Sequence, residues 1–294
     1  MTLKEFFSEQ QQLIDAALDR LTPAESEHPA TIHRAMRHSL FAGGKRIRPI
    51  LCISAAAAVS DHSEAVMNAA CSLEMIHTYS LIHDDLPALD NDDFRRGKPT
   101  CHKVFGEAMA ILAGDALFTL AIQTLTRIVG ADPARVVALI RELSFASGTV
   151  EGMIGGQVTD IESERLPPTA ELLDSIHRAK TGALLRASVR MGGVAAGGEH
   201  AQIEALSRYG EHVGLAFQIV DDILDVEESS EALGKTAGKD AAQGKITFPA
   251  VYGLDDSREM AQEQCWRAHE ALASFGEGAR RLHEIADLIV QRKS

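Results

Sequence analysis

The sequence is poor in aromatic residues and lacks the patterns of several common folds. Only 5% of its 294 residues are Phe, Trp or Tyr, and alternating or β-branched runs bounded by hairpin turns are nearly absent. The long apolar stretches hold Ala, Leu, Ile and Val, which favours helices over a stacked β-sandwich. The glycine-rich nucleotide-binding patterns GxGxxG and GxxxxGK[ST] are also missing. The composition therefore predicts an all-α protein.

Cysteine, basic charge and long apolar runs are also scarce. The 4 cysteines form no CxxC pair, so we interpret them as reduced structural thiols. The 29 basic residues against 42 acidic ones give a net charge of -13, which disfavours nucleic acid as a ligand. The most continuous apolar run, Ile50–Val59, is too short to span a bilayer, and the N-terminus resembles no targeting peptide. We expect a cytoplasmic protein without membrane insertion.

Apolar residues recur at helical spacing through most of the chain. Two long amphipathic helices are predicted at residues 62–86 and 203–225. Further helices are predicted at 3–21, 30–42, 47–60, 107–129, 134–152, 170–191 and 257–290, the last broken near 274–278. No linker or fixed-period repeat divides the chain. The sequence thus predicts a single domain, residues 1–294, built of about ten helices.

Two aspartate clusters stand at the C-terminal ends of the two long predicted helices. The first is DDLPALD at 84–90 and the second is DDILD at 221–225. In the second cluster Asp221 and Asp225 are four residues apart and share a helix face, while Asp222 lies about 100° round. At least two carboxylates of this cluster therefore point the same way.

The first cluster needs a break in its helix before its carboxylates can converge. Pro87 opens the helix there, and the residues between Asp84 and Asp90 must bulge. Carboxylates at about 4 Å repel by about 4 kcal/mol at an effective dielectric near 20, so converging aspartates need cations. Oxygen ligands select Mg²⁺, which proteins typically share between a few carboxylates and substrate phosphates. A single acidic run is usually a solvated helix end, but two similar runs in apolar helices indicate a diphosphate ligand.

Short basic segments could hold a second diphosphate. They are GGKRIRP at 43–49, Arg95-Arg96, Lys180-Thr181-Gly182 and Gly234-Lys235. Glycine lets the backbone approach an anion, and arginine offers paired donors where lysine offers a point charge. Each segment alone would be an ordinary surface loop, so their weight comes from occurring together with the aspartates.

These motifs resemble the trans-isoprenyl diphosphate synthases, and most closely the bacterial short-chain type that makes farnesyl diphosphate (geranyltranstransferase). The resemblance extends over nearly the whole chain and also includes GQVTDI at 156–161, KTG at 180–182 and FQIVDDILD at 217–225. It implies a bundle of helices around a central cavity, a homodimer, and Mg²⁺-dependent joining of an allylic diphosphate to isopentenyl diphosphate. The departure from relatives is Asn91, which lies outside the spaced ligand set.

The resemblance also implies a role for each matching residue. The metal ligands would be Asp84, Asp85 and Asp90 in the first cluster, and Asp221 in the second, supported by Asp222 and Asp225. The allylic diphosphate would be held by Arg95, Lys180 and Lys235, with Thr181 and Gln218 facing the allylic carbons. Isopentenyl diphosphate would be held by Lys45, Arg48, His77 and Arg96. Tyr79 and Ser80, five and four residues before Asp84, would limit product length.

Three other functions are weighed against a farnesyl product. A sibling synthase would give a C10 or C20 product from the same motifs. An HD-type metal phosphohydrolase would use His77, His83 and Asp84, but it leaves GGKRIRP and DDILD unexplained. A non-catalytic subunit of a heteromeric synthase is disfavoured by the intact aspartate motifs.

Overall fold

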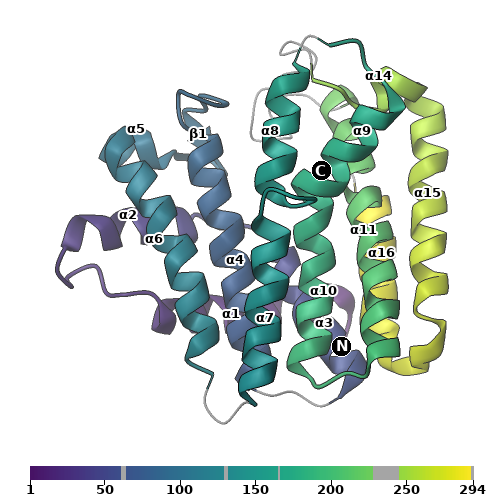
Figure 1. Ribbon diagram of the computed structural model, residues 1–294, viewed down its shortest axis with the longest axis horizontal. Helices are drawn as coiled ribbons and strands as arrows, with labels where there is room; N and C mark the ends of the chain where they lie inside the picture. The colour runs from purple at the N-terminus through teal and green to yellow at the C-terminus, as the bar shows by residue number, and fades with distance from the viewer. Residues whose placement is uncertain (61–63, 129–131, 165, 228–244, 293–294) are drawn as a thin grey trace. The chain divides into compact units, whose positions relative to one another are not determined.

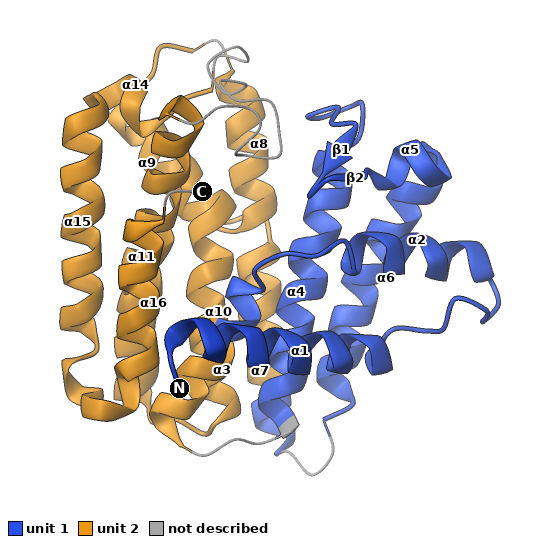
Figure 2. Ribbon diagram, turned by 180° about the vertical axis from the view of Figure 1, so that it is seen from behind, with its two compact units in different colours: residues 1–50, 63–136 blue, residues 51–62, 137–294 orange. Residues whose placement is uncertain are grey.

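The computed structural model describes residues 1–60, 64–128, 132–164, 166–227 and 245–292, and these are nearly all helical (Figure 1). The all-α prediction is confirmed. Strand structure in these ranges is a short antiparallel ribbon of β1 (Phe94–Arg95) and β2 (Lys98–Pro99). The chain divides into two compact units, which Figure 2 colours separately. Unit 1 comprises residues 1–50 and 63–136, and unit 2 comprises residues 51–62 and 137–294.

Unit 1 carries the first aspartate motif. Its helices are α1 (Leu3–Leu21), α2 (Ala30–Leu40), the start of α3 (Ile47–Val59), α4 (Glu64–Asp84), α5 (Cys101–Phe105), α6 (Glu107–Thr126) and the start of α7 (Pro133–Ser147). A capping box explains where α1 begins, because Thr2 and Glu5 each bond the other's backbone N–H. These bonds satisfy amide groups that the first turn leaves without helical partners.

Helix α4 is fixed against α6 by apolar packing and by two buried polar contacts. The Ser72 hydroxyl donates to the Ala121 carbonyl at 2.9 Å, and the Asn68 amide donates to the Thr124 carbonyl at 3.2 Å. Helix α6 has 20 residues and is long and apolar enough, by length and composition alone, to cross a membrane. Helices of a protein core pass the same test, and α6 packs along α4 with part of its surface buried.

Unit 2 carries the second aspartate motif on its longest helix. Its described elements are the remainder of α3 and α7, α8 (Met153–Ser163), α9 (Ala170–His177), a π-helical turn (Arg178–Gly182), α10 (Ala183–Ala195), α11 (His200–Glu227), α14 (Phe248–Tyr252), α15 (Leu254–Ala271), a 3₁₀ segment (Ala273–Ala279) and α16 (Arg280–Gln291). Helix α11 packs against α10, α15 and α16. Its Tyr209 is fully buried and donates a 2.7 Å hydrogen bond to the Leu282 carbonyl of α16.

The observed helices follow the predicted ones with local exceptions. The predicted helix at 170–191 contains the π-helical turn, and the predicted helix at 257–290 breaks at the 3₁₀ segment, as expected near 274–278. Helices α5, α8 and α14 were not predicted, because they are short or glycine-rich. The single domain remains a prediction.

Candidate active site

The loop after α4 folds back on itself at the first aspartate motif. The Asp90 N–H donates to the Asp84 carbonyl at 2.8 Å, and the Leu89 N–H donates to the Leu86 carbonyl at 2.9 Å. The residues between the two aspartates therefore bulge, as the sequence required. Both Asp84 and Asp90 are partly exposed at the end of the helix. This donor set suits a hard cation such as Mg²⁺.

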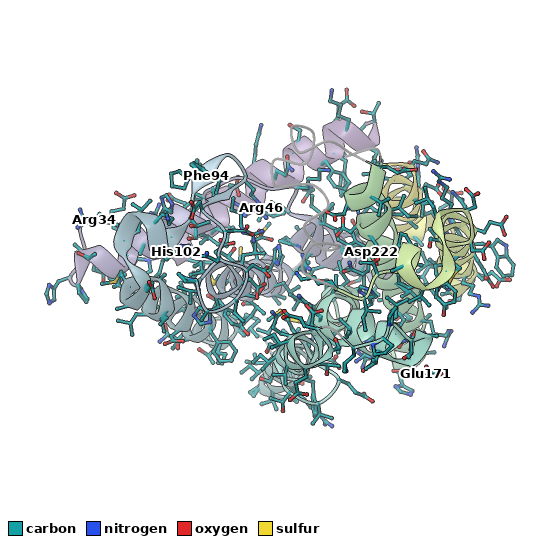
Figure 3. The ribbon with its side chains drawn as sticks, turned by 90° about the horizontal axis from the view of Figure 1, so that it is seen from above. Arg34, Arg46, Phe94, His102, Glu171 and Asp222 are labelled. Carbon is teal, nitrogen blue, oxygen red and sulfur yellow. The ribbon has the colours of Figure 1, made fainter. Side chains whose placement is uncertain are left out.

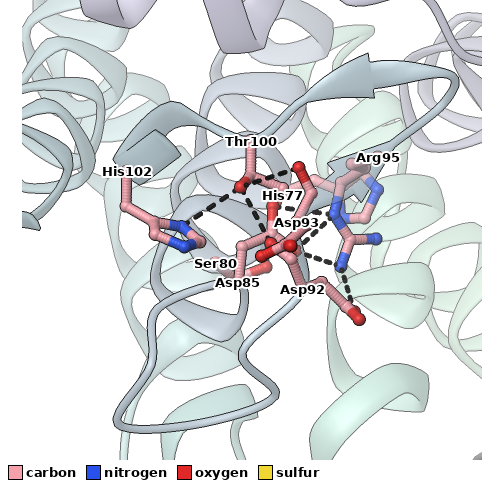
Figure 4. Close-up of polar contacts among 8 residues, drawn as sticks. All are labelled: His77, Ser80, Asp85, Asp92, Asp93, Arg95, Thr100 and His102. Carbon is pink, nitrogen blue, oxygen red and sulfur yellow. Dashed lines mark hydrogen bonds and ion pairs between the residues drawn. The ribbon is translucent and has the colours of Figure 1, made fainter. Parts of the chain in front are cut away.

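The Asp85 carboxylate is buried and paired with an arginine. Its carboxylate accepts three hydrogen bonds of 2.6–3.0 Å from the Arg95 guanidinium, and Asp85 is only 3% exposed (Figure 4). Burial raises the pKa of Asp85, and the contact with Arg95 opposes that rise. Asp92 lies 3.9 Å from the same guanidinium. Asp85 therefore orients the guanidinium of Arg95. The role of Asp85 as a metal ligand stays a prediction.

Basic side chains gather around His77 on α4. Burial lowers the pKa of His77 well below its usual value, and the positive charges of Arg48, Arg96, Arg95 and Arg46 lower it further. The imidazole is therefore neutral near pH 7. Arg46 and Arg95 are paired with carboxylates, so the positive charge that would suit an anion in this part of unit 1 is that of Arg48 and Arg96.

Arg96 and Lys45 lie at the accessible edge of this cluster. The Arg96 guanidinium donates to the Gly43 carbonyl, and a Cβ at Gly44 would collide with that guanidinium. Gly44 also has a φ of +127°, which favours glycine. The GG pair of GGKRIRP thus lets Arg96 lie on the backbone, while Lys45 is exposed.

Arg46 is the structural residue of the GGKRIRP segment. Its guanidinium donates to Glu74 at 2.6 Å, to Asp15 at 2.9 Å and to the Leu40 carbonyl at 2.7 Å. Arg46, labelled in Figure 3, is 3% exposed. Burial alone would lower its pKa, but the charge of Glu74 raises it above the usual value. The sequence could not single out Arg46, because Glu74 lies 28 residues further along the chain.

Asp221 is the accessible aspartate of the second motif. Its carboxylate lies 2.5 Å from the Arg292 guanidinium, which also donates to the Phe217 carbonyl at 2.8 Å and stacks on the Phe217 ring at 4.1 Å. The side chain of Asp221 is 44% exposed. Arg292 carried no signal in the sequence, since a lone arginine near a chain end has no recognisable spacing. In the structure it is a counter-ion for the aspartate that was expected to bind metal.

The other two aspartates of this motif are buried. Asp222, labelled in Figure 3, is 2% exposed and Asp225 is 5% exposed. Asp222 accepts from the Gln218 amide at 2.8 Å and from the Phe248 N–H at 2.9 Å. It therefore ties α11 to the start of α14. The role expected for Asp222 in supporting a metal ion stays a prediction, and the structure shows these internal hydrogen bonds.

Thr181 and Gln218 meet in the structure. The Thr181 hydroxyl donates to the Gln218 side-chain oxygen at 2.8 Å, and the opposite end of that amide is held by Asp222. These two hydrogen bonds fix the orientation of the Gln218 amide. Both side chains are partly exposed, so their dipoles are available to a ligand.

Lys180 is held by Asp160, the aspartate of GQVTDI. The ammonium lies 2.6 Å from the Asp160 carboxylate. The π-helical turn that contains Lys180 packs directly on Gly156, where a Cβ would overlap the Lys180 backbone. π-Helical turns are frequent at functional sites. Lys235, expected to bind the same diphosphate, lies outside the described residues.

Tyr79 and Ser80 lie on α4, five and four residues before Asp84. The Tyr79 ring lies edge-on to Phe118 at 5.4 Å and to His83 at 5.7 Å, and the residue is 7% exposed. Burial, with the charge of Asp84, raises the pKa of its hydroxyl to about 12. The Ser80 hydroxyl donates to the His77 carbonyl at 2.8 Å. Tyr79 is thus a fixed ring, and Ser80 is the smaller, partly exposed neighbour.

The chain is similar to known prenyl diphosphate synthases over nearly its whole length. It is 51% identical over 270 residues to the heterodimeric geranylgeranyl pyrophosphate synthase large subunit 1, chloroplastic, of Arabidopsis thaliana, covering 90% of this chain and 72% of the relative. It is 46% identical to the chloroplastic geranylgeranyl pyrophosphate synthase of Capsicum annuum, covering 98% and 78%. The crystal structure of an FPP/GFPP synthase from Zymomonas mobilis matches with a TM-score of 0.87 and 36% identity, covering 98% of each chain. The polyprenyl synthetase family model matches residues 29–279. The chain belongs to the polyprenyl synthetase family.

Proposed function

We propose that this chain is a Mg²⁺-dependent prenyl diphosphate synthase that extends an allylic diphosphate with isopentenyl diphosphate to a C20 product. The proposed product length rests on the relatives at 46–51% identity, which are named as geranylgeranyl pyrophosphate synthases. They favour the C20 alternative over the farnesyl product expected from the sequence. The two aspartate motifs and the basic cluster around His77 supply the chemistry that this reaction needs.

The basic cluster of unit 1 is proposed to hold isopentenyl diphosphate. His77, Arg48, Arg96 and Lys45 bring donors and positive charge to one part of the fold. An anion there would offset the positive charge of Arg48 and Arg96 and favour protonation of His77. Arginine and lysine bind a diphosphate through charge-assisted hydrogen bonds, which are stronger than neutral ones. No side chain needs to form a covalent bond with the substrate.

Asp84, Asp90 and Asp221 are proposed to hold the magnesium ions. Magnesium bound there would stabilise the charge that develops on the leaving diphosphate of the allylic substrate. Lys180 and Arg95 are each proposed to bind a diphosphate group, Lys180 oriented by Asp160 and Arg95 oriented by Asp85. Arg292 would have to share or leave Asp221 when a metal ion binds there.

Thr181 and Gln218 are proposed to face the allylic carbons. The Gln218 carbonyl oxygen and the Thr181 oxygen present negative dipole ends, which stabilise a developing allylic cation. Their orientation is fixed in advance by Asp222, so little reorganisation is needed during the reaction. Apolar surroundings would exclude water, which otherwise captures such a cation. The released diphosphate is the proposed acceptor of the final proton.

A C15 product is the second candidate, and Tyr79 favours it. The ring is braced by Phe118 and His83 and lies on the helix that leads to Asp84. Five residues of helix rise about 7.5 Å, so a fixed ring there could end a growing tail. A C20 product requires the tail to pass this ring.

The phosphohydrolase alternative is disfavoured because it leaves the GGKRIRP and DDILD segments unexplained. The Nε2 atom of His83 lies 3.1 Å from the Ile111 carbonyl, so the backbone of α6 orients the ring. Metal-binding histidines are often held in this way, so the contact does not decide between the two functions.

We also propose that the chain assembles as a homodimer through exposed apolar side chains of unit 1. Val104, Ile111 and Leu112 on α5 and α6 are 45–53% exposed. Apolar patches of this kind mark interaction surfaces. One relative is named as the large subunit of a heterodimer, so a smaller partner chain is the competing assembly.

Product analysis tests the proposed function directly. The full chain is incubated with Mg²⁺, dimethylallyl diphosphate and excess isopentenyl diphosphate, and the dephosphorylated products are separated by chromatography. We expect a C20 alcohol as the end product. Accumulation of a C15 alcohol would support the second candidate. Absence of any condensation product would contradict a catalytic role, and release of phosphate from esters without condensation would support the hydrolase.

A further inference from the structure

A cluster of cysteine, histidine and aspartate lies between α15 and α16, outside the residues used above. Among the residues that the structure describes, ligand atoms of Cys265, His269 and Asp287 all lie within 4.8 Å of one another. Cys265 and His269 are four residues apart on α15, and His283 and Asp287 are four residues apart on α16. This spacing puts each pair on one helix face. Two helices thus present their potential ligands to each other.

The separations within the cluster approach those of a zinc site. The Cys265 Sγ atom lies 3.6 Å from Asp287 Oδ1, and His269 Nε2 lies 2.8 Å from the same oxygen. Zinc bonds of about 2.0–2.3 Å in a tetrahedron separate neighbouring ligand atoms by roughly 3.3–3.7 Å. The sulfur–oxygen distance already has this value. The nitrogen–oxygen distance needs to widen by less than about 1 Å.

His283 orients His269 for such a role. The two Nδ1 atoms lie 2.5 Å apart, and the rings stack with centroids 4.7 Å apart. The Nδ1 atom of His283 faces the Nδ1 atom of His269, so one of the two rings donates the hydrogen bond between them. The Nε2–H of His269 donates to the Asp287 carboxylate at 2.8 Å, and a metal ion bound at Nε2 would replace that proton. Metal-binding histidines almost always have their second nitrogen held by such a partner.

Burial differs across the cluster in a way that suits a metal ion. Cys265 is 7% exposed, whereas the side chains of His269 and Asp287 are 32% and 49% exposed. An ion can therefore enter from solvent, and a water molecule can complete its coordination. A cysteine binds a metal ion as its thiolate, so an incoming ion releases a proton from Cys265.

We propose that Cys265, His269 and Asp287 bind one Zn²⁺ ion or a similar transition-metal ion that fastens α15 to α16. A thiolate and an imidazole select such ions over Mg²⁺, so this site is chemically distinct from the aspartate motifs. A thiolate and a carboxylate also balance the two charges of the ion. Helix α16 leads to Arg292, so the ion fastens the helix that places a counter-ion on Asp221.

Cobalt is the probe, because Co²⁺ bound by a thiolate gives a near-ultraviolet charge-transfer band that oxygen-only sites lack. The reduced full-length chain is freed of metal, placed in excess Mg²⁺ and titrated with Co²⁺. We expect the band to saturate at one equivalent, to disappear on addition of Zn²⁺, and to be lost in Cys265→Ala and His269→Gln. The matched control Cys101→Ala, which removes another buried cysteine, should keep the band.

Thermal unfolding supplies the second readout. Zn²⁺ should raise the melting temperature of the natural chain and of Cys101→Ala, but not that of His269→Gln, whose half-exposed position tolerates the change. Prenyl transfer in Mg²⁺ should be the same in Cys265→Ala and the natural chain. Absence of the band in the natural chain, or its persistence in both Cys265→Ala and His269→Gln, would overturn the proposal.

Discussion

Removing one partner of the buried ion pair of Arg46 and Glu74 is expected to destabilise unit 1 strongly. The two side chains are 1% and 2% exposed, and their closest atoms are 2.6 Å apart. Glu74→Gln keeps the shape of the side chain but removes its charge, which leaves the guanidinium buried with Asp15 as its remaining charged partner. Removing one partner of a buried pair typically costs about 3–5 kcal/mol, because the remaining charge stays desolvated. Asp15 is 49% exposed, so its compensation is weak.

Urea unfolding monitored by circular dichroism measures this cost. We expect Glu74→Gln to lower the free energy of unfolding by about 3 kcal/mol or more. The double variant Arg46→Met/Glu74→Leu should recover most of the loss, since an apolar replacement removes both charges together. The control Glu263→Gln breaks an ion pair with Arg267 whose side chains are 52% and 47% exposed, and should change stability by less than about 1 kcal/mol. A loss below that of the control would refute the reasoning.

Three further predictions follow from the sites. Gly156→Ala should lower stability by about 1–3 kcal/mol and reduce turnover, because the added Cβ meets rigid Lys180 backbone; equal melting temperatures and rates would contradict this. The pKa of His77 is depressed in the folded chain, so the unfolded chain binds more protons and the free energy of unfolding falls as pH drops below about 6.5. His77→Gln should remove up to about 1.4 kcal/mol per pH unit of this pH dependence, measured by urea titrations at pH 7, 6 and 5. An unchanged pH dependence would show that another group is responsible. Tyr79→Ala should lengthen the products and Ser80→Phe should shorten them in chromatography, whereas an active Tyr79→Ala enzyme with unchanged products would place the limit of chain length elsewhere.

The helices could be predicted from sequence where one physical signal dominates. Helix α1 matches its predicted bounds, because Thr2 and Glu5 form a local capping box. The π-helical turn at Arg178–Gly182 was missed, and in the structure its backbone packs against Gly156 of α8. Hydrophobic periodicity contains no information about such a tertiary contact.

The candidate site shows the same division between local and distant causes. The fold-back of the first motif followed from Pro87 and the spacing of two aspartates. Two ion pairs of the site could not be predicted from the sequence. Lys180 pairs with Asp160 and Asp221 pairs with Arg292, and in each pair the two residues belong to different segments that only the fold brings together. Spacing identifies which residues share a helix face, but it does not identify what packs against that face.

Turnover of two aspartate variants tests the central claim that both motifs act in a Mg²⁺-dependent prenyl transfer. Formation of products from dimethylallyl and isopentenyl diphosphate is measured for Asp84→Ala, for Asp221→Ala and for the control Asp174→Ala, which breaks an exposed ion pair with Arg178. Circular dichroism verifies that each variant is folded. We predict that turnover falls by orders of magnitude in the first two variants and is unchanged in the control. Near-normal turnover by folded Asp84→Ala and Asp221→Ala would contradict the account.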